Sequence, residues 1–267
     1  RLSLAEGSAH CLTLRSHDDA AAIGARLRRG VPVVILGGGF IGLEIAAAAR
    51  AHGCLVTVVE AQPRLLMRGV PEQIAAVIQA EHAAQGVTIR TGTGIVSIAD
   101  DGEVARIGLS DGSSLTAGLV VIGIGAVPNV GLAEQAGLVL DNGIAVDAHL
   151  VSSDPAISAV GDCASFPVAL YGGRRVRLES WRNTQDHSAV AAANLLGEDV
   201  ALDAVPWFWS DQYGLGLQVA GLVDEANTTV RRDLGDGAFI LFGLDSEGRL
   251  VAASGIGPGN AVARDVR

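Results

Sequence analysis

The segment from Val31 to Glu60, VPVVILGGGFIGLEIAAAARAHGCLVTVVE, limits the possible folds more than any other part of this chain. It begins with an apolar run, residues 33–36, which is typical of a strand buried on both faces. Three glycines follow at the spacing of a dinucleotide-binding loop: Gly37, Gly39 and Gly42. In such a loop the glycines allow a tight turn, close approach of the backbone to a pyrophosphate, and close packing of the helix on the strand.

The rest of this segment completes the nucleotide-binding pattern. A helix is expected to run through His52, with its N-terminal amides and the positive end of its dipole directed at a phosphate. A second strand, Leu55 to Val59, is followed by Glu60. A carboxylate at this position accepts hydrogen bonds from both ribose hydroxyls and repels a 2′-phosphate, so the pattern predicts NAD rather than NADP.

Two other interpretations of the segment are weaker. A glycine-rich turn without a nucleotide is disfavoured because the glycines lie between a strand and a helix, with the acid at the expected distance. A membrane span over Val31 to Ala49 is disfavoured by Pro32, the glycines and Glu44, since a carboxylate near the middle of a span is costly.

Composition sets broad limits on the rest of the chain. The 267 residues suffice for two domains and a small third, and the high apolar content suits packed parallel α/β layers. The net charge of −10 disfavours a nucleic-acid partner. The cysteines Cys11, Cys54 and Cys163 form neither a disulfide framework nor a CxxC pair, and no signal peptide is evident, so a reducing cytoplasm is expected.

Helices are expected on both sides of this segment. Ser16 and Asp19 form a capping box for a helix predicted over residues 18–29. A second helix is predicted over residues 72–85, where His82 is assigned to the solvent face.

Short strands are expected in two further regions. After a strand at residues 87–90, turns containing Gly102 and Gly112 predict an antiparallel meander over residues 95–116. A buried strand at residues 119–122 then ends in the glycine-containing turn GIGAVPN, residues 123–129, where the backbone can approach a ligand or simply turn. A further strand is predicted at residues 144–147, and a short buried strand within residues 151–160 leads into Gly161 and Asp162. A small antiparallel sheet is predicted at residues 215–219, 228–232, 239–244 and 250–254.

Several polar residues have a functional and a structural interpretation. Arg64 and Arg68 follow the ribose-binding acid, and each is either a contact to the adenosine part of the nucleotide or a solvated charge, with Arg68 the better candidate. Asp162 follows a predicted strand and can bind a ribityl hydroxyl of a flavin. The helix expected from Asn183 is either an ordinary capped helix or one whose N-terminus stabilises a reduced flavin ring. Arg15 is a surface residue unless it contacts a cofactor.

The order of the motifs resembles the FAD-dependent, NADH-linked ferredoxin reductases of the putidaredoxin reductase and aromatic-ring dioxygenase type. The resemblance depends on LRSHDDA around Arg15, GGGFIGLE at 37–44, GIGAVPN at 123–129, AVGDCA at 159–164, ESWRN at 179–183 and, most distinctively, PWFWSDQ at 206–212. It implies an α/β fold: a Rossmann-like NAD-binding domain with a parallel sheet and a β-meander, part of an FAD-binding α/β domain, and a small α+β C-terminal domain. Thr184 and His187 depart from the family, which usually has Ala and Gln there.

The resemblance also implies roles for individual residues. It assigns Arg15 and Asp162 to FAD, places Trp181 beside the isoalloxazine and places Glu44 near the nicotinamide, with Gly125 lining the same pocket. The residues implied to hold NAD are Gly37, Gly39, Phe40, Ile41, Gly42 and Glu60, together with Arg68. No catalytic acid or base and no metal ligand is predicted, because the protein only positions the rings and tunes the flavin.

The family begins with an FAD-binding βαβ unit that would precede Arg1, so the chain is expected to be a fragment that holds FAD poorly alone. The expected divisions are residues 1–14, a remnant of the FAD domain; 15–128, the NAD domain; 129–204, the second part of the FAD domain; and 205–267, an incomplete C-terminal domain.

The implied reaction passes a hydride from NADH to FAD and then single electrons to a [2Fe–2S] ferredoxin that serves an oxygenase. Four arginines are predicted to steer an acidic ferredoxin toward the flavin edge by their charge: Arg174, Arg175, Arg177 and Arg182. The alternatives are an NADH-dependent rubredoxin or disulfide reductase of the same fold, and an NAD- and FAD-binding interaction module without turnover.

Overall fold

In the computed structural model, which describes residues 2–266, the chain forms two compact units. Unit 1 comprises residues 1–125 and 210–215, and unit 2 comprises residues 126–209 and 216–267. In the described part of the chain, no helix is long and apolar enough to cross a membrane.

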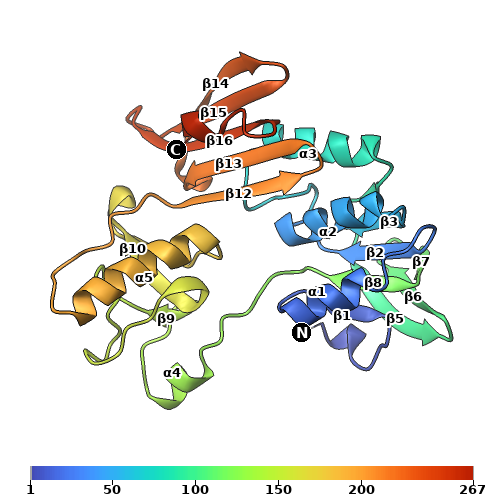
Figure 1. Ribbon diagram of the computed structural model, residues 1–267, viewed down its shortest axis with the longest axis horizontal. Coiled ribbons are helices and arrows are strands. Elements are labelled where there is room, and N and C mark those ends of the chain that lie inside the picture. The colour runs from blue at the N-terminus through green and yellow to red at the C-terminus, as the bar shows by residue number, and fades with distance from the viewer. Residues whose placement is uncertain (1, 267) are drawn as a thin grey trace. The chain divides into compact units, whose positions relative to one another are not determined.

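Unit 1 is built on a five-stranded parallel sheet in the order β1-β8-β2-β3-β4 (Figure 1). The strands are β1 (Cys11–Thr13), β8 (Leu119–Ile122), β2 (Pro32–Leu36), β3 (Leu55–Val59) and β4 (Thr88–Arg90). Ile35 of the central strand pairs with Val58 on one side and Val121 on the other. Because side chains on both faces of β2 are buried, its sequence is continuously apolar rather than alternating.

Three helices and a meander complete unit 1. The helices are α1 (His17–Gly24), α2 (Phe40–Ala51) and α3 (Glu72–Ala84), preceded by a 3₁₀ turn at Ser3–Ala5. The antiparallel meander consists of β5 (Ile95–Asp101), β6 (Val104–Leu109) and β7 (Ser114–Ala117). Ile107 and Leu109 of the meander share a buried cluster with Val34, Leu36 and Val120 of the sheet. The meander therefore covers the sheet in place of a crossover helix, and the predicted Rossmann-like domain with a meander is confirmed.

Unit 2 contains a small sheet in the order β11-β10-β9 and a longer one in the order β12-β13-β16-β15-β14. The small sheet, β9 (Ile144–Ala145), β10 (Ala164–Val168) and β11 (Arg174–Val176), accompanies α4 (Gly131–Gln135) and α5 (Trp181–Leu195). Its core cluster includes Val146, Leu150 and Phe166.

The longer sheet contains β12 (Trp207–Gln212), β13 (Leu215–Gly221), β14 (Thr228–Gly235), β15 (Ala238–Leu244) and β16 (Leu250–Pro258), and α6 (Ala263–Val266) follows it. Three further 3₁₀ turns occur at Gly161–Cys163, Ala169–Tyr171 and Val223–Glu225. The residues at the β12–β13 turn, 210–215, belong to unit 1.

Two predicted elements are wrong, and three strands were not predicted. The first helix ends at Gly24 rather than at residue 29, because the following residues leave the helix so that Leu27 is buried and Arg26 donates to the carbonyl of Ala9 at 2.8 Å. Residues 151–160 form no strand and make only the bridge Val151–Ser158, since no described strand pairs along them. Strands β10, β11 and β12 were not predicted from the sequence pattern.

The solvent-facing assignment of His82 is also wrong, because its side chain is fully buried in unit 1. Ile74, Ile78 and His82 follow one another at intervals of four along α3, and all three are buried. This spacing places them on one face of the helix, so the signal for burial was present in the sequence.

Candidate functional site

The turn between β2 and α2 brings the predicted nucleotide-loop glycines together at the carboxyl edge of the parallel sheet. Gly37 has φ +108°, and a Cβ there would overlap the carbonyl of Gly123, which follows β8. A Cβ on Gly42 would overlap the carbonyl of Gly37. Both positions therefore require glycine, one for its conformation and both for the close approach of two backbones.

The N-terminus of α2 is open. Gly39 is the N-cap residue and supplies no side-chain hydrogen bond to the helix amides, and a Cβ on it would meet no atom within 4 Å. Ile41 is 51% exposed on the first turn, and the ring of Phe40 packs where a side chain on Gly69 would have to lie. The uncapped amides and the helix dipole make this end suitable for a phosphate group.

Glu60 is tied to the same loop. Its Oε2 accepts a hydrogen bond of 2.7 Å from the Gly38 amide, and its Oε1 accepts one of 2.7 Å from the Gln62 amide. Each carboxylate oxygen has a second lone pair, so the group can still accept bonds from ribose hydroxyls. The fixed negative charge disfavours a 2′-phosphate at this place.

The two arginines after Glu60 differ in their roles. The guanidinium of Arg64 donates to carbonyls of its own loop: those of Leu65, Leu66, Met67 and Val70, at 3.0–3.2 Å. Arg64 is therefore a residue that organises the loop rather than a solvated charge. Arg68 is exposed, and the described part of the chain provides no hydrogen bond or ion pair to its side chain, which leaves it free to reach a nucleotide.

Glu44 and Gly125 lie on the other elements around the loop. Glu44 is exposed on α2 and accepts a 2.6 Å hydrogen bond from the Ser210 hydroxyl. Gly125 follows β8 with φ +108° and has no atom within 4 Å of a built Cβ. The loop, Glu60, Glu44 and Gly125 therefore all belong to unit 1, at the elements where a doubly wound fold binds dinucleotides.

The residues predicted to bind a flavin are divided between the units. Arg15 is exposed in unit 1, where its backbone amide donates to Asp19 at 2.9 Å. Asp162 lies in unit 2, in the 3₁₀ turn that begins at Gly161. Trp181 begins α5 in unit 2, is 65% exposed, and has its ring centroid 6.1 Å from that of Trp209.

In the described part of the chain, two buried donors on α5 of unit 2 lack an acceptor. The Gly161 amide donates to Nδ1 of His187 at 3.1 Å, so the hydrogen of this imidazole is on Nε2. That Nε2 and Nδ2 of Asn183 are buried without an acceptor in the described part of the chain. Burial lowers the pKa of His187 to about 4 against an opposing effect of Asp186, so the ring is neutral at pH 7. Unsatisfied buried donors are costly and suit a site that a polar cofactor or a further chain segment completes.

The four arginines of the docking hypothesis all form ion pairs within unit 2. Arg174 pairs with Asp224 and Glu225, which raise its pKa, and Arg182 pairs with Asp186. Arg175 donates to the carbonyls of Val146 and Ser165 at 2.8 and 2.5 Å and also lies 3.7 Å from Asp141. Arg177 pairs with Glu179 at 2.7 Å and donates to the carbonyl of Asp162 at 3.0 Å. Arg175 and Arg177 therefore hold backbone carbonyls of unit 2 in place.

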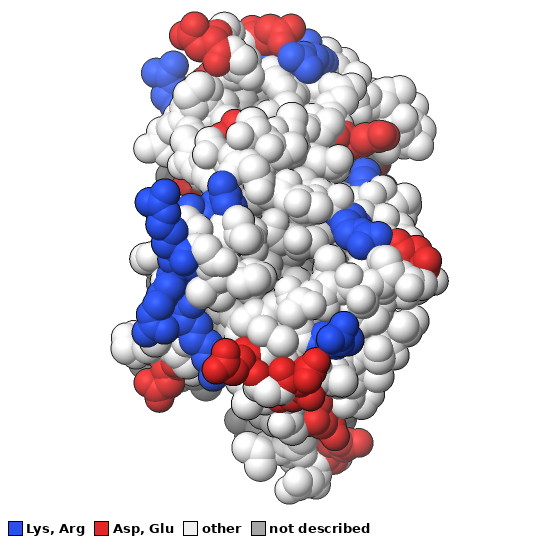
Figure 2. Space-filling view, turned by 90° about the vertical axis from the view of Figure 1, so that its right-hand side faces the viewer, with Lys and Arg blue, Asp and Glu red and all other residues white. Residues whose placement is uncertain are grey.

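Charge on the surface is nevertheless unevenly distributed. On the face drawn in Figure 2, Arg side chains, coloured blue, gather in a band at one edge. The chain contains no lysine, so every basic side chain is an arginine. Local basic areas therefore exist in spite of the net charge of −10.

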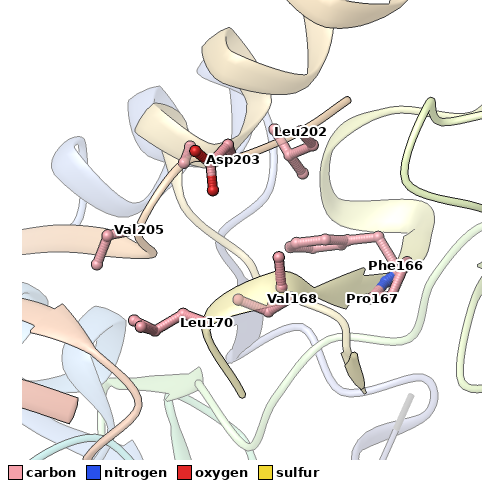
Figure 3. Close-up of a pocket in the computed structure, with 9 residues that line it drawn as sticks. Phe166, Pro167, Val168, Leu170, Leu202, Asp203 and Val205 are labelled. Atoms are coloured by element: carbon pink, nitrogen blue, oxygen red, sulfur yellow. The ribbon is translucent and has the colours of Figure 1, made fainter. Parts of the chain in front are cut away.

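A pocket of about 440 Å³ in unit 2 lies apart from these residues (Figure 3). Phe166, Val168 and Leu170 line it from β10 and the turn after it, and Leu202 and Val205 line it from the segment before β12. Asp203 is its one charged lining residue, and none of the predicted cofactor residues borders it. This pocket therefore has little chemistry to offer a redox cofactor.

Comparisons with known proteins agree with this geometry. The profile of the pyridine nucleotide-disulphide oxidoreductases matches residues 1–188, and the reductase C-terminal profile matches residues 207–265. The chain is 46% identical to the ferredoxin–NAD(+) reductase component of the anthranilate 1,2-dioxygenase system of Burkholderia cepacia, over 93% of this chain and 61% of that protein. It is 38% identical to rubredoxin–NAD(+) reductase of Ectopseudomonas oleovorans, over 81% of this chain and 56% of that protein.

Among solved structures, the covalent complex of putidaredoxin reductase with putidaredoxin matches with a TM-score of 0.93 and 36% identity, over 100% of this chain and 65% of that one. The chain thus spans about three fifths of the length of the curated relatives that it matches.

Proposed function

Because the chain belongs to the pyridine nucleotide-disulphide oxidoreductase family, we propose that the protein containing it carries electrons from NADH through FAD to a ferredoxin. The ferredoxin is a [2Fe–2S] protein that feeds an oxygenase. Bound FAD would accept a hydride from NADH and release single electrons to the iron–sulfur protein. The observation that carries the proposal is the open glycine loop with Glu60 bonded across it, in a chain whose relatives are ferredoxin–NAD(+) reductases.

The residues of unit 1 would bind and orient NADH. The amides at the start of α2 would receive the pyrophosphate, and Glu60 would accept the adenosine ribose hydroxyls, with Arg68 at the adenosine end. Glu44 and Gly125 would border the nicotinamide. None of these residues needs to exchange a proton with the substrate, because hydride transfer between stacked rings depends on their placement.

The residues of unit 2 would hold FAD. Asp162 would accept a ribityl hydroxyl, and Trp181, with its exposed ring, would lie beside the isoalloxazine. The buried donors of Asn183 and His187 on α5, which lack an acceptor in the described part of the chain, support a polar group beside this helix. Arg15, which the resemblance to the family assigns to FAD, is also proposed to contact it.

We further propose that arginines attract the acidic ferredoxin. Arg174 and Arg182 are the better candidates, since Arg175 and Arg177 hold backbone carbonyls in place. Their ion pairs with Asp224, Glu225 and Asp186 reduce the field that they present to a partner. Charge reversal at Arg182 is expected to slow ferredoxin reduction and to leave reduction of a small dye unchanged; equal losses would remove docking by charge.

The experiment that tests the proposed function uses the protein extended to the length of its relatives. We expect a yellow protein that oxidises NADH in preference to NADPH and reduces a [2Fe–2S] ferredoxin faster than a rubredoxin. A colourless protein, or one that prefers NADPH, would contradict it.

A rubredoxin reductase is the second candidate, because the chain is 38% identical to one such enzyme. Faster reduction of rubredoxin would favour it. In the described part of the chain, the three cysteines are free thiols, so these residues supply no dithiol for a disulfide reductase. A stable NADH complex without electron transfer to any acceptor would instead indicate an interaction module.

A further inference from the structure

A continuous series of hydrogen bonds leads from the core of unit 1 to Glu44. We call it the polar chain; its members, in order, are Tyr213, His82, Gln212, Ser210 and Glu44. The four bonds measure 3.2 Å from Tyr213 to His82, 2.8 Å from His82 to Gln212, 3.1 Å from Gln212 to Ser210, and 2.6 Å from Ser210 to Glu44. Of its five members, only Glu44 has a functional role implied from the sequence.

The chemistry of the groups determines the direction of every bond. Nε2 of the Gln212 amide donates to the Ser210 hydroxyl, so Oε1 of the same amide must accept from His82. Nε2 of His82 then carries the hydrogen, and Nδ1 accepts from the Tyr213 hydroxyl. Ser210 in turn donates to the carboxylate of Glu44, which can only accept when ionised. All donors therefore point toward the carboxylate, which is the arrangement that polarises each bond in favour of the charge.

The states of the two ring residues agree with this direction. Burial lowers the pKa of His82, against opposing effects of Gln212 and Glu81, so the imidazole is neutral. Burial also raises the pKa of Tyr213 to about 12, so its hydroxyl keeps its proton.

The burial of the polar chain shows that it is more than a surface network. His82 is 0%, Ser210 2% and Gln212 3% exposed, whereas Glu44 is exposed at the end of the chain. An apolar residue at position 82 would continue the buried face formed by Ile74 and Ile78 at lower cost. A buried polar network rigidifies the groups that it connects when each member is satisfied. The polar chain therefore fixes the positions of its side chains.

We propose that His82, Gln212 and Ser210 are positioning residues that hold the carboxylate of Glu44 toward the carboxamide of NADH. The inference rests on the proposed function, since it takes NADH to bind at the loop before α2. The carboxamide N–H groups of nicotinamide are donors that a fixed carboxylate accepts. Glu60, which the proposed function places at the adenosine ribose, bonds the Gly38 and Gln62 amides and lies outside the polar chain. A change in the polar chain is therefore expected to affect the nicotinamide half of the ligand and not the adenosine half.

The test compares two ligands in direct binding measurements on the protein. NADH contains the nicotinamide, whereas ADP-ribose lacks it and retains the pyrophosphate and adenosine. Ser210→Ala removes one oxygen and leaves Gln212 and Glu44 without their shared partner. It should weaken NADH binding about fivefold and leave ADP-ribose binding unchanged. Ser210→Thr, which keeps a hydroxyl, should restore most of the loss. Ser254→Ala provides the matched control, because Ser254 is an equally buried serine outside the polar chain.

A double-mutant cycle asks whether Ser210 acts through Glu44. In a Glu44→Ala background, Ser210→Ala should have no further effect on NADH binding. The proposal is overturned if Ser210→Ala weakens both ligands equally, if it changes neither, or if its effect persists undiminished without Glu44. Failure of the parent protein to bind NADH and ADP-ribose at all would contradict the proposed function itself and remove the positioning role with it.

Discussion

The carboxylate of Glu60 accepts a hydrogen bond from the amide of Gly38 at 2.7 Å, so the residue predicted to select the nucleotide also ties down the loop that would hold it. Glu60 therefore affects both the shape of the glycine loop and the choice between NAD and NADP. A substitution at this position acts on both, and the two effects can be separated by comparing nucleotides.

Glu60→Gln retains the size of the side chain and removes its charge. An amide accepts at only one of its two end atoms, so one of the bonds to the Gly38 and Gln62 amides is lost. We expect NADH binding to weaken about tenfold and the preference over NADPH to shrink, measured by fluorescence titration with both nucleotides. Glu103→Gln, on the exposed turn after β5, is the control. An unchanged ratio of the two affinities would rule out Glu60 as the selecting residue.

Gly42→Ala is expected to lower stability, whereas Gly39→Ala is expected to weaken NADH binding. The added methyl at Gly42 overlaps the Gly37 carbonyl, so we expect a loss of about 3 kcal/mol in the free energy of unfolding. The methyl at Gly39 meets no protein atom within 4 Å, so the fold should keep its stability while NADH binding falls at least about tenfold. Denaturant unfolding and NADH titration of both variants check this pair. Equal stability of the two variants would contradict the packing argument.

His187 should make the stability of unit 2 depend on pH. Its pKa is about 4 when folded and 6.5 ordinarily, so between these values the unfolded chain binds the extra proton. The contribution of neutral His187 to the free energy of unfolding is fully present above pH 6.5. It is lost as the pH falls toward 4, by up to about 3 kcal/mol. All three tryptophans lie in unit 2, so tryptophan fluorescence during denaturant unfolding at pH 7 and pH 5 reports on this unit.

His187→Gln supplies the control for that measurement. Gln does not titrate, so the variant should lose less stability than the parent between pH 7 and pH 5. If parent and variant weaken by the same amount, another group is responsible.

Arg177→Met should loosen the turn that contains Asp162. The guanidinium of Arg177 holds the Asp162 carbonyl at 3.0 Å, and Met keeps the apolar part of the side chain while removing the donor. In the protein extended to the length of its relatives, we expect flavin content after dialysis to fall at least about twofold, measured by visible absorbance. Arg182→Met is the control. Arg182 pairs with Asp186 within α5, so this variant should retain its flavin. Equal flavin content in both variants would argue against a flavin next to Asp162.

Local pattern in the sequence was sufficient for the nucleotide-binding half of unit 1. Residues 55–59 and 119–122 were predicted as strands and form β3 and β8 with those bounds, because continuous apolar residues between turn residues have few other solutions. The three loop glycines and Glu60 could be named in advance, since their spacing is set by the backbone of a single turn. The cofactor roles of these residues, and those of Arg15, Asp162 and Trp181, stay predictions.

Only the tertiary structure decided which distant residues meet. The sequence contains Glu44, His82 and Ser210, but nothing local indicates that an α2 carboxylate, an α3 imidazole and a hydroxyl 166 positions after Glu44 share one series of hydrogen bonds. For the same reason the pattern overestimated the freedom of Arg174, Arg175, Arg177 and Arg182, whose acidic and carbonyl partners are distant in sequence or set by the fold. A local pattern reports which face of an element is apolar, whereas the partner of a polar side chain depends on which elements pack together, and long-range packing alone determines that.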